Sequence, residues 1–195
     1  MDDKSFFDKI AVDWDANEVL STAEKVREIL GQMELKKGQR VLDLGTGTGV
    51  LIPFIAEKIG EKGEIMAVDF SEEMLKRAKE KFGNIIPSLL FLNLDFENET
   101  IPGEFDRIIL YCVYPHLNTP VETLKWLKTV NLKPDGKIFI AFPCDNNFIN
   151  NIHRERLSQS DSLPSPSQLV AFLKDQGLHA EVVADTPESY IVSIK

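Results

Sequence analysis

Residues 41–50 carry the strongest chemical signal in the chain: an apolar run that contains one carboxylate, Asp43, and then three glycines at alternating positions. Glycine lets a backbone turn tightly and approach a ligand because it has no Cβ. The apolar run predicts a buried parallel strand, and the apolar residues 50–56 predict a helix. A strand, a glycine turn and a helix N-terminus in this order predict a nucleotide-type cofactor site at the carboxyl edge of an α/β sheet. A glycine-rich connection without a ligand is the simpler alternative, but it does not require three alternating glycines.

The spacing of the glycines distinguishes two kinds of cofactor. A dinucleotide site has the pattern G-x-G-x-x-G, in which the third glycine stands three places after the second. That place is Val50 here, and the third glycine comes one residue earlier, at Gly49. Asp43 would also repel a pyrophosphate at short range, which disfavours NAD. S-Adenosylmethionine suits this carboxylate better, because it carries a sulfonium and an ammonium and no phosphate.

Segment 41–50 resembles motif I of the class I S-adenosylmethionine-dependent methyltransferases, and further motifs of that family follow in order. Two more apolar strands end in carboxylates, at Asp69 and Asp95. Residues 105–110 occupy the motif IV position, and residues 132–140 resemble the family's turn into the fifth strand. Each motif alone is a weak signal, but the series in correct order identifies the chain as a member of the family.

This resemblance implies S-adenosylmethionine as the cofactor and S-adenosylhomocysteine as its product. It implies that Asp69 binds the ribose hydroxyls, that Met74 packs against the adenine, and that Asp95 accepts a hydrogen bond from the adenine amino group. An aromatic residue of the N-terminal arm covers the cofactor in several relatives, and Trp14 is the candidate here. The expected cofactor-binding residues are Trp14, Asp43, Gly45, Thr46, Gly47, Gly49, Asp69, Phe70, Met74, Asp95, Phe96 and Tyr111.

The alternation of strand and helix patterns predicts an α/β fold. The family resemblance implies a Rossmann-like, doubly wound sheet of seven strands, mostly parallel with an antiparallel last strand and with helices on both faces. The connection 97–104 is short and rich in turn residues, so a loop is expected there instead of a helix. A single domain is expected over 1–195, with an N-terminal arm and helix lid (1–37), a cofactor-binding core (38–142), a polar and irregular substrate lid (143–166), and a C-terminal helix with the last strands (167–195).

Polar residues after the fourth and fifth predicted strands are candidates for binding or activating the methyl acceptor. Ligands of open α/β sheets bind beyond the carboxyl ends of the strands, where both segments leave the sheet. We hypothesise that His116, His153 and Asn150 converge over the methyl group, where they bind an anionic substrate or a histidine acts as general base. Tyr114 is a further candidate substrate residue. No metal site is expected, because no Asp, Glu or Cys completes the histidine pair at a ligand spacing.

Composition limits the partners of the chain. Its 195 residues carry a formal net charge of −9, which disfavours a nucleic-acid substrate because phosphate backbones require a basic face. The segment after the fourth strand also lacks the Asn/Asp-Pro-Pro-aromatic tetrad of base-methylating enzymes. The two cysteines, Cys112 and Cys144, are expected as thiols of a cytoplasmic protein, with no signal segment and no membrane span. The expected partner is a small-molecule substrate, and the expected assembly is a monomer or a homodimer.

The leading hypothesis is methyl transfer to a small-molecule acceptor by in-line displacement. Residues 6–15 resemble the opening of the ubiquinone/menaquinone-biosynthesis C-methyltransferases, but residues 111–118 lack the Arg-Asn stretch of those enzymes. A quinone precursor is therefore an alternative substrate. A non-catalytic partner subunit that binds S-adenosylmethionine or S-adenosylhomocysteine is a second alternative, and a nicotinamide dehydrogenase is a third. Calorimetry with NAD and S-adenosylmethionine separates the dehydrogenase from the methyltransferase.

Overall fold

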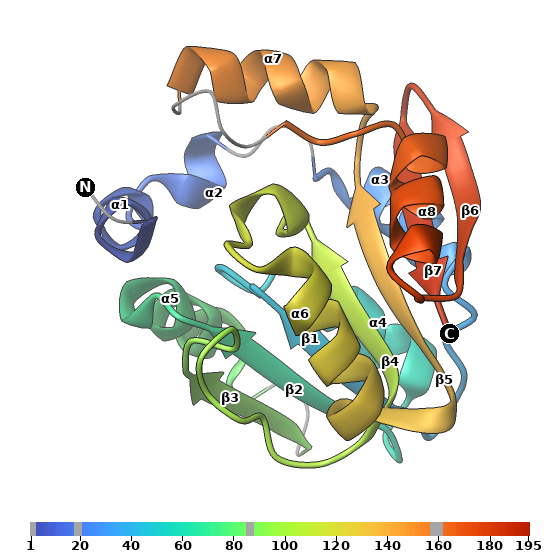
Figure 1. The fold of residues 1–195 in the computed structure, drawn as a ribbon. Coiled ribbons are helices and arrows are strands. Elements are labelled where there is room, and N and C mark those ends of the chain that lie inside the picture. The colour runs from blue at the N-terminus through green and yellow to red at the C-terminus, as the bar shows by residue number, and fades with distance from the viewer. Residues whose placement is uncertain (1–2, 18–20, 85–87, 157–161) are drawn as a thin grey trace.

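The computed structural model describes residues 3–17, 21–84, 88–156 and 162–195, and of residues 3–4, 16–17 and 152–156 only the backbone (Figure 1). The described residues contain a seven-stranded sheet in the order β3-β2-β1-β4-β5-β7-β6. The strands are β1 (Arg40–Leu44), β2 (Glu64–Asp69), β3 (Leu89–Asn93), β4 (Phe105–Tyr111), β5 (Leu132–Phe142), β6 (Ala180–Thr186) and β7 (Ser189–Ile194).

The pairing of the strands confirms the predicted topology. Strands β1 to β5 pair in parallel, and β7 lies antiparallel between β5 and β6. The central strands β1 and β4 are almost completely buried and mostly apolar, as parallel strands covered on both faces require. Their carboxyl ends meet at one edge of the sheet, so the residues that follow them are brought together there.

Helices cover both faces of the sheet because strand side chains alternate between the two faces. Val41 points into a core with helices α3 (Ala23–Gly31), α4 (Ile52–Ile59) and α5 (Glu72–Phe82). Leu42 points into a core with α6 (Pro120–Trp126) and α8 (Pro166–Asp175). In the part of the chain that the structure describes, no helix is long and apolar enough to cross a membrane. The α-helices are α1 (Asp3–Ile10), α2 (Trp14–Asn17), α3 (Ala23–Gly31), α4 (Ile52–Ile59), α5 (Glu72–Phe82), α6 (Pro120–Trp126), α7 (Asn146–Arg156) and α8 (Pro166–Asp175).

Local capping explains where two of these helices begin. The Ser71 hydroxyl accepts a hydrogen bond from the backbone N–H of Met74 at 3.1 Å, which fixes the start of α5 directly after β2. Ser165 and Gln168 form a reciprocal capping box at the start of α8. The first of these caps matters for the site, because it places the N-terminus of α5 at the carboxyl edge of the sheet.

The two connections singled out in the sequence have different outcomes. The link between β3 and β4 contains turns and no helix, as predicted. The segment after β5 was expected to be irregular over 143–166, and this was wrong, since residues 146–156 form helix α7. The Asp145 carboxylate accepts a hydrogen bond from the Phe148 backbone N–H at 2.8 Å, and Ile149 is buried beneath the helix. A cap and an apolar anchor thus order a segment whose composition is polar.

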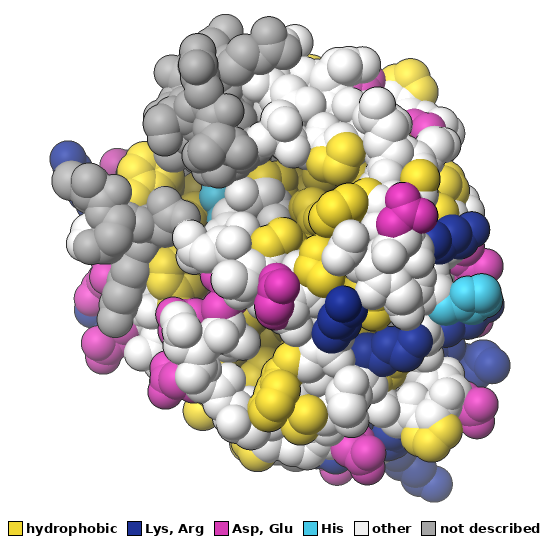
Figure 2. Space-filling view, viewed as in Figure 1, with side chains coloured by type: hydrophobic (Ala, Val, Ile, Leu, Met, Phe, Trp, Pro, Cys, Tyr) yellow, Lys and Arg dark blue, Asp and Glu magenta, His cyan; other side chains and the backbone are white. Residues whose placement is uncertain are grey.

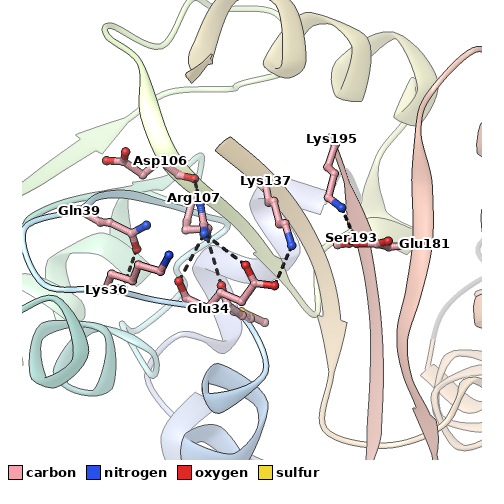
Figure 3. A network of polar contacts seen from close by, with 10 residues as sticks. Glu34, Lys36, Gln39, Asp106, Arg107, Lys137, Glu181, Ser193 and Lys195 are labelled. Atoms are coloured by element: carbon pink, nitrogen blue, oxygen red, sulfur yellow. Dashed lines mark hydrogen bonds and ion pairs between the residues drawn. The ribbon is translucent and has the colours of Figure 1, made fainter. Parts of the chain in front are cut away.

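A network of ion pairs lies at the opposite, amino-terminal edge of the sheet (Figure 3). The guanidinium of Arg107, which is 5% exposed, donates to the carbonyl oxygens of Met33 and Glu34. Lys137 forms a 2.8 Å ion pair with Glu34. These contacts connect the segment between α3 and β1 to β4 and β5, and we assign them a structural role because they lie away from the carboxyl ends of the strands.

Candidate active site

A cavity of about 640 Å³ lies at the carboxyl ends of the strands, within the usual range of roughly 300–1,000 Å³ for ligand sites. Its walls come from the ends of β1, β2, β4 and β5, from the loop after β3, and from helices α1, α2, α5 and α7. In Figure 1, α1 and α2 lie on one side of this edge and α7 extends across its top. The cavity therefore lies where open α/β sheets bind their ligands.

Asp43 forms the buried end of β1 in this cavity. Its side chain is 1% exposed and accepts a 2.6 Å hydrogen bond from the Thr46 hydroxyl. Burial raises the pKa of Asp43 to about 7, and the nearby Asp69 carboxylate adds to this, whereas the Thr46 hydrogen bond opposes it. A cationic ligand group beside Asp43 would favour the ionised carboxylate.

The backbone of the glycine turn lies close to neighbouring side chains, as the three glycines in the sequence indicate. Gly45 and Gly47 have positive φ angles of 66° and 55°. A Cβ on Gly45 would collide with Val113, whereas the space beside Gly47 is open and belongs to the cavity. Gly49 does not line the cavity, contrary to expectation. A Cβ on Gly49 would lie 2.8 Å from the Ile52 Cδ1 atom, so this glycine permits helix packing and not ligand contact.

Asp69 at the end of β2 is held by two backbone N–H groups. One carboxylate oxygen accepts from Gly47 N at 2.8 Å and the other from Ser71 N at 2.9 Å. Burial raises the pKa of Asp69 to about 6, the backbone hydrogen bonds oppose this, and the Asp8 carboxylate adds to it. Each oxygen has a further lone pair for a ligand, so this carboxylate is oriented to accept from two neighbouring hydroxyls.

The loop after β3 forms the next wall of the cavity. The two oxygens of Asp95 accept hydrogen bonds from Glu97 N at 3.1 Å and Asn98 Nδ2 at 2.7 Å, and Phe96 is buried. Both residues line the cavity, as does Met74 from α5. The structure thus brings Asp43, Asp69 and Asp95 to one cavity, which agrees with the spacing of the three strand ends in the sequence.

Glu97 is a site residue that the sequence reasoning missed. Its carboxylate accepts from the backbone N–H groups of Asn118 at 3.0 Å and Thr119 at 2.8 Å, and from their side chains. Burial would raise the pKa of Glu97, but the hydrogen bonds from Asn118 and Thr119 outweigh it and leave the pKa lowered. Glu97 thereby joins the loop after β3 to the loop after β4.

Helices α1 and α2 close the cavity from the N-terminal side. Phe7 makes edge-to-face ring contacts with Phe70 at 5.8 Å, Trp14 at 5.9 Å and His116 at 5.4 Å between ring centroids. Phe7 was also missed, although the aromatic residues near the N-terminus gave a signal for it. Trp14 also lines the cavity.

Two acidic side chains attach this lid to the glycine turn and to α5. Asp8 accepts a 2.6 Å hydrogen bond from the Ser71 hydroxyl. Asp15 accepts from the Thr48 hydroxyl at 2.5 Å and forms a 2.8 Å ion pair with Lys81. Burial would raise the pKa of Asp15, but the hydrogen bonds from Lys81 and Thr48 lower it overall. The lid is therefore attached to the same turn that surrounds the open space at Gly47.

The candidate acceptor residues do not converge as hypothesised. His116 lines the cavity from the short 3-10 turn Tyr114–His116. Asn150 does not line it, because its amide oxygen accepts from Leu163 N at 2.7 Å and its amide nitrogen donates to Leu163 O at 2.9 Å. Tyr114 packs into the core and borders a separate hollow. The side chain of His153 lies outside the described residues.

The fold and this cavity define the architecture of the class I S-adenosylmethionine-dependent methyltransferases. The chain matches the model of the methyltransferase domain family over residues 35–179, and it belongs to that family. Among the residues that the structure describes, no cluster of three or more His, Cys, Asp or Glu side chains could hold a metal ion.

Similar proteins agree with this assignment. The UbiE ubiquinone/menaquinone biosynthesis C-methyltransferase of Edwardsiella ictaluri is 32% identical over 109 residues, which is 54% of this chain and 43% of that protein. The Bacillus subtilis protein YqeM, whose name assigns it provisionally to the methyltransferases, is 36% identical over 110 residues, 54% of this chain and 42% of YqeM. The chain thus matches less than half the length of these curated relatives.

Two solved structures share the fold at low sequence identity. A SAM-dependent methyltransferase from Aquifex aeolicus aligns with a TM-score of 0.72 at 24% identity, covering 100% of this chain and 98% of that one. The DhpI–SAH complex aligns with a TM-score of 0.76 at 18% identity, covering 98% of this chain and 93% of that one. At these identities the likeness concerns the fold alone.

Proposed function

We propose that this chain transfers a methyl group from S-adenosylmethionine to a small-molecule acceptor and leaves S-adenosylhomocysteine. The main support is Asp69, whose carboxylate is fixed by Gly47 N and Ser71 N beside the open space at Gly47. Bound S-adenosylmethionine supplies an electrophilic methyl group on a sulfonium, with a thioether as the leaving group. The named complexes of related folds with this cofactor and its product agree with the proposal.

The charges of the cavity favour this cofactor over a dinucleotide. Asp43 and Asp69 are both buried on the wall nearest the glycine turn. A pyrophosphate there would meet two carboxylates in a poorly screened environment. An ammonium or sulfonium would instead offset their charge.

Each cofactor-side residue has a defined task under this proposal. Asp69 accepts from the ribose hydroxyls, Asp95 accepts from the adenine amino group, and Met74 and Phe96 contact the adenine ring. Phe7 and Trp14 cover the site and exclude water. Holding donor and acceptor in line contributes up to roughly 7–11 kcal/mol in favourable cases, so positioning is the main task of these side chains.

His116 is the proposed proton acceptor for an acceptor hydroxyl or amine. It lines the cavity from the end of the β4 segment, and the ring of Phe7 fixes one side of its imidazole. Histidine titrates near the pH at which such a proton must be taken up.

Neither cysteine forms a disulfide, which supports the further proposal that the protein works in a reducing, cytoplasmic environment.

Calorimetry with purified protein tests the cofactor assignment. We expect S-adenosylhomocysteine to bind and NAD to give no signal. Replacing Asp69 with Ala should weaken S-adenosylhomocysteine binding by about tenfold or more, because a hydrogen bond to a charged group contributes about 1.5–3 kcal/mol. Asp175→Ala, at the exposed end of α8, is the matched control and should bind normally. Binding of NAD, or equal affinity in both variants, would contradict the assignment.

A quinone precursor is the second candidate acceptor, because the UbiE relatives match half of this chain at 30–32% identity. Incubation with labelled S-adenosylmethionine and a prenylated quinol precursor tests it, and label on a ring carbon would support it. Binding of S-adenosylhomocysteine without transfer to any tested acceptor would instead support a non-catalytic subunit.

A further inference from the structure

The part of the cavity wall that comes from the lid helices, from the segments after β4 and β5 and from α7 consists mainly of rings and apolar side chains. We call this part the acceptor half and define it by Phe7, Trp14, His116, Leu117, Phe142 and Phe148. These residues come from both lid helices, from the segments after β4 and β5, and from α7. Residues from four separate parts of the chain thus form one apolar surface.

The rings of the acceptor half are held in place by other rings. Phe7 contacts Trp14 and His116 edge to face, at interplanar angles of 61° and 88°. Phe142 is 1% exposed and packs edge to face on Tyr190 at 5.4 Å. Phe148, by contrast, is 47% exposed on α7. The acceptor half thus combines rings that pack on other rings with one half-exposed ring, Phe148.

The charged groups near the acceptor half already have partners within the protein. Asp15 is paired with Lys81 and Thr48, and Glu97 accepts from Asn118 and Thr119. Among the cavity-lining residues that the structure describes, none is Lys or Arg. Figure 2 shows hydrophobic side chains across much of this face, including its centre, and most Lys and Arg side chains toward the right and lower right.

We infer that the acceptor is an uncharged, ring-bearing molecule held by aromatic contacts, and not an anion. This inference rests on the proposed function and specifies its substrate class. A carboxylate or phosphate in the acceptor half would share the cavity with the carboxylates of Asp15 and Glu97, and no described Lys or Arg side chain lines the wall to offset its charge. The sequence hypothesis allowed an anionic substrate, and our inference favours a neutral one instead.

A matched pair of probes tests the inference directly. 2-Naphthol and 2-naphthoate share one ring system and differ in charge at pH 7.5. We expect 2-naphthol to bind at least about tenfold more tightly, measured by calorimetry on both the free and the S-adenosylhomocysteine-saturated protein. Equal or tighter binding of the naphthoate, or displacement of the naphthol by S-adenosylhomocysteine, would overturn the inference.

A matched pair of variants locates the bound ring. Phe148 on α7 and Phe172 on α8 are both about half exposed, at 47% and 45%, but only Phe148 lines the cavity. Phe148→Ala should weaken 2-naphthol binding by about fivefold and Phe172→Ala by less than about twofold. Equal effects of the two substitutions would overturn the inference, and far-ultraviolet circular dichroism checks that both variants fold.

The same titrations separate failure of the inference from failure of the proposed function. If S-adenosylhomocysteine does not bind but 2-naphthol binds in a Phe148-dependent way, the cofactor assignment fails and the acceptor class stands. If S-adenosylhomocysteine binds and the charged probe is preferred, the acceptor class fails and the cofactor assignment stands.

Discussion

Asp43 is a buried acid in a place where its charge is unfavourable unless a cation is bound. The Thr46 hydroxyl is its one neighbouring donor among the described hydrogen bonds, and the side chain is 1% exposed. In the folded protein its pKa is about 7, against 3.8 for an ordinary aspartate. Folding therefore favours the protonated form, which has a consequence for stability.

The difference in pKa predicts a pH dependence of stability. Below pH 3.8 both states are protonated, and as the pH rises toward 7 the unfolded chain loses the proton first, so the free energy of unfolding falls. The effect is on the order of 4 kcal/mol at pH 8. Asp43→Asn, which keeps the acceptor for Thr46, should match the parent at low pH and exceed its stability at pH 8. Urea unfolding at both pH values measures this.

Two comparisons make the result specific to Asp43. Asp175→Asn, an exposed substitution, should leave the pH dependence of unfolding unchanged. A gain in stability of Asp43→Asn that is the same at both pH values would show that the ionisation of this carboxyl is not the cause.

At the scale of elements, the N-terminal lid depends on a few polar contacts with α5 and the glycine turn. Asp8 accepts from Ser71, and Asp15 contacts both Thr48 and Lys81. Because α1 and α2 are short, these contacts contribute substantially to holding them over the cavity.

Removing one lid contact should therefore loosen the lid. Asp15→Ala leaves the Thr48 hydroxyl and the Lys81 ammonium without this acceptor, and we expect about fivefold weaker S-adenosylhomocysteine binding. Amide hydrogen exchange in residues 3–17 should speed up in the same variant. Glu73→Ala removes an exposed ion pair with Lys76 on the outside of α5 and serves as the control. An unchanged rate of amide hydrogen exchange in Asp15→Ala would contradict the role of Asp15 in holding the lid over the cavity.

Glu97 acts between two loops rather than within one. Its carboxylate accepts hydrogen bonds from Asn118 and Thr119, which follow His116 by two and three residues. Glu97 therefore positions the turn that carries the histidine. Glu97→Ala should lower kcat more than it raises the KM for S-adenosylmethionine. It should reduce stability by only about 0.5–1.5 kcal/mol, because Asn118 and Thr119 are exposed and water can replace the lost acceptor. Glu122→Ala, exposed on α6, should change neither quantity. Steady-state kinetics and urea unfolding provide the measurements.

On the scale of the whole molecule, the two edges of the sheet have separate tasks. The carboxyl edge holds the cavity, and the amino edge holds the ion-pair network around Arg107 (Figure 3). The sheet between the two edges is buried on both faces. We therefore expect residues of the carboxyl edge to affect mainly ligand binding and residues of the amino edge to affect mainly stability.

Substitutions at the two edges should therefore have opposite profiles. Arg107→Ala leaves the buried carbonyl oxygen of Met33 and the partly buried one of Glu34 without their donor, and should lower the free energy of unfolding by about 3 kcal/mol. Its affinity for S-adenosylhomocysteine, measured at a temperature where the variant is folded, should equal that of the parent. A parallel loss of affinity would mean that the amino edge communicates with the site.

The sequence predicted the α/β class from its alternation of strands and helices, and the convergence of Asp43, Asp69 and Asp95, whereas the antiparallel last strand came from the family resemblance. The convergence is readable because it depends on a local pattern, an apolar strand that ends in a carboxylate, and parallel strands place such ends at one edge. Glycine spacing likewise indicated the class of cofactor, since positive φ and the absence of a Cβ are properties of a single residue.

How the cavity is closed, and which polar residues face it, depends on contacts that form only when distant segments pack together. Asp8 meets Ser71 across 63 positions of sequence, and Asn150 turns away from the cavity to pair with the Leu163 backbone. Such contacts have no periodic signature, because they form when separate elements pack together and each polar group takes the nearest partner. Chemistry local to one strand end was therefore predictable, whereas chemistry that depends on two distant segments meeting was not.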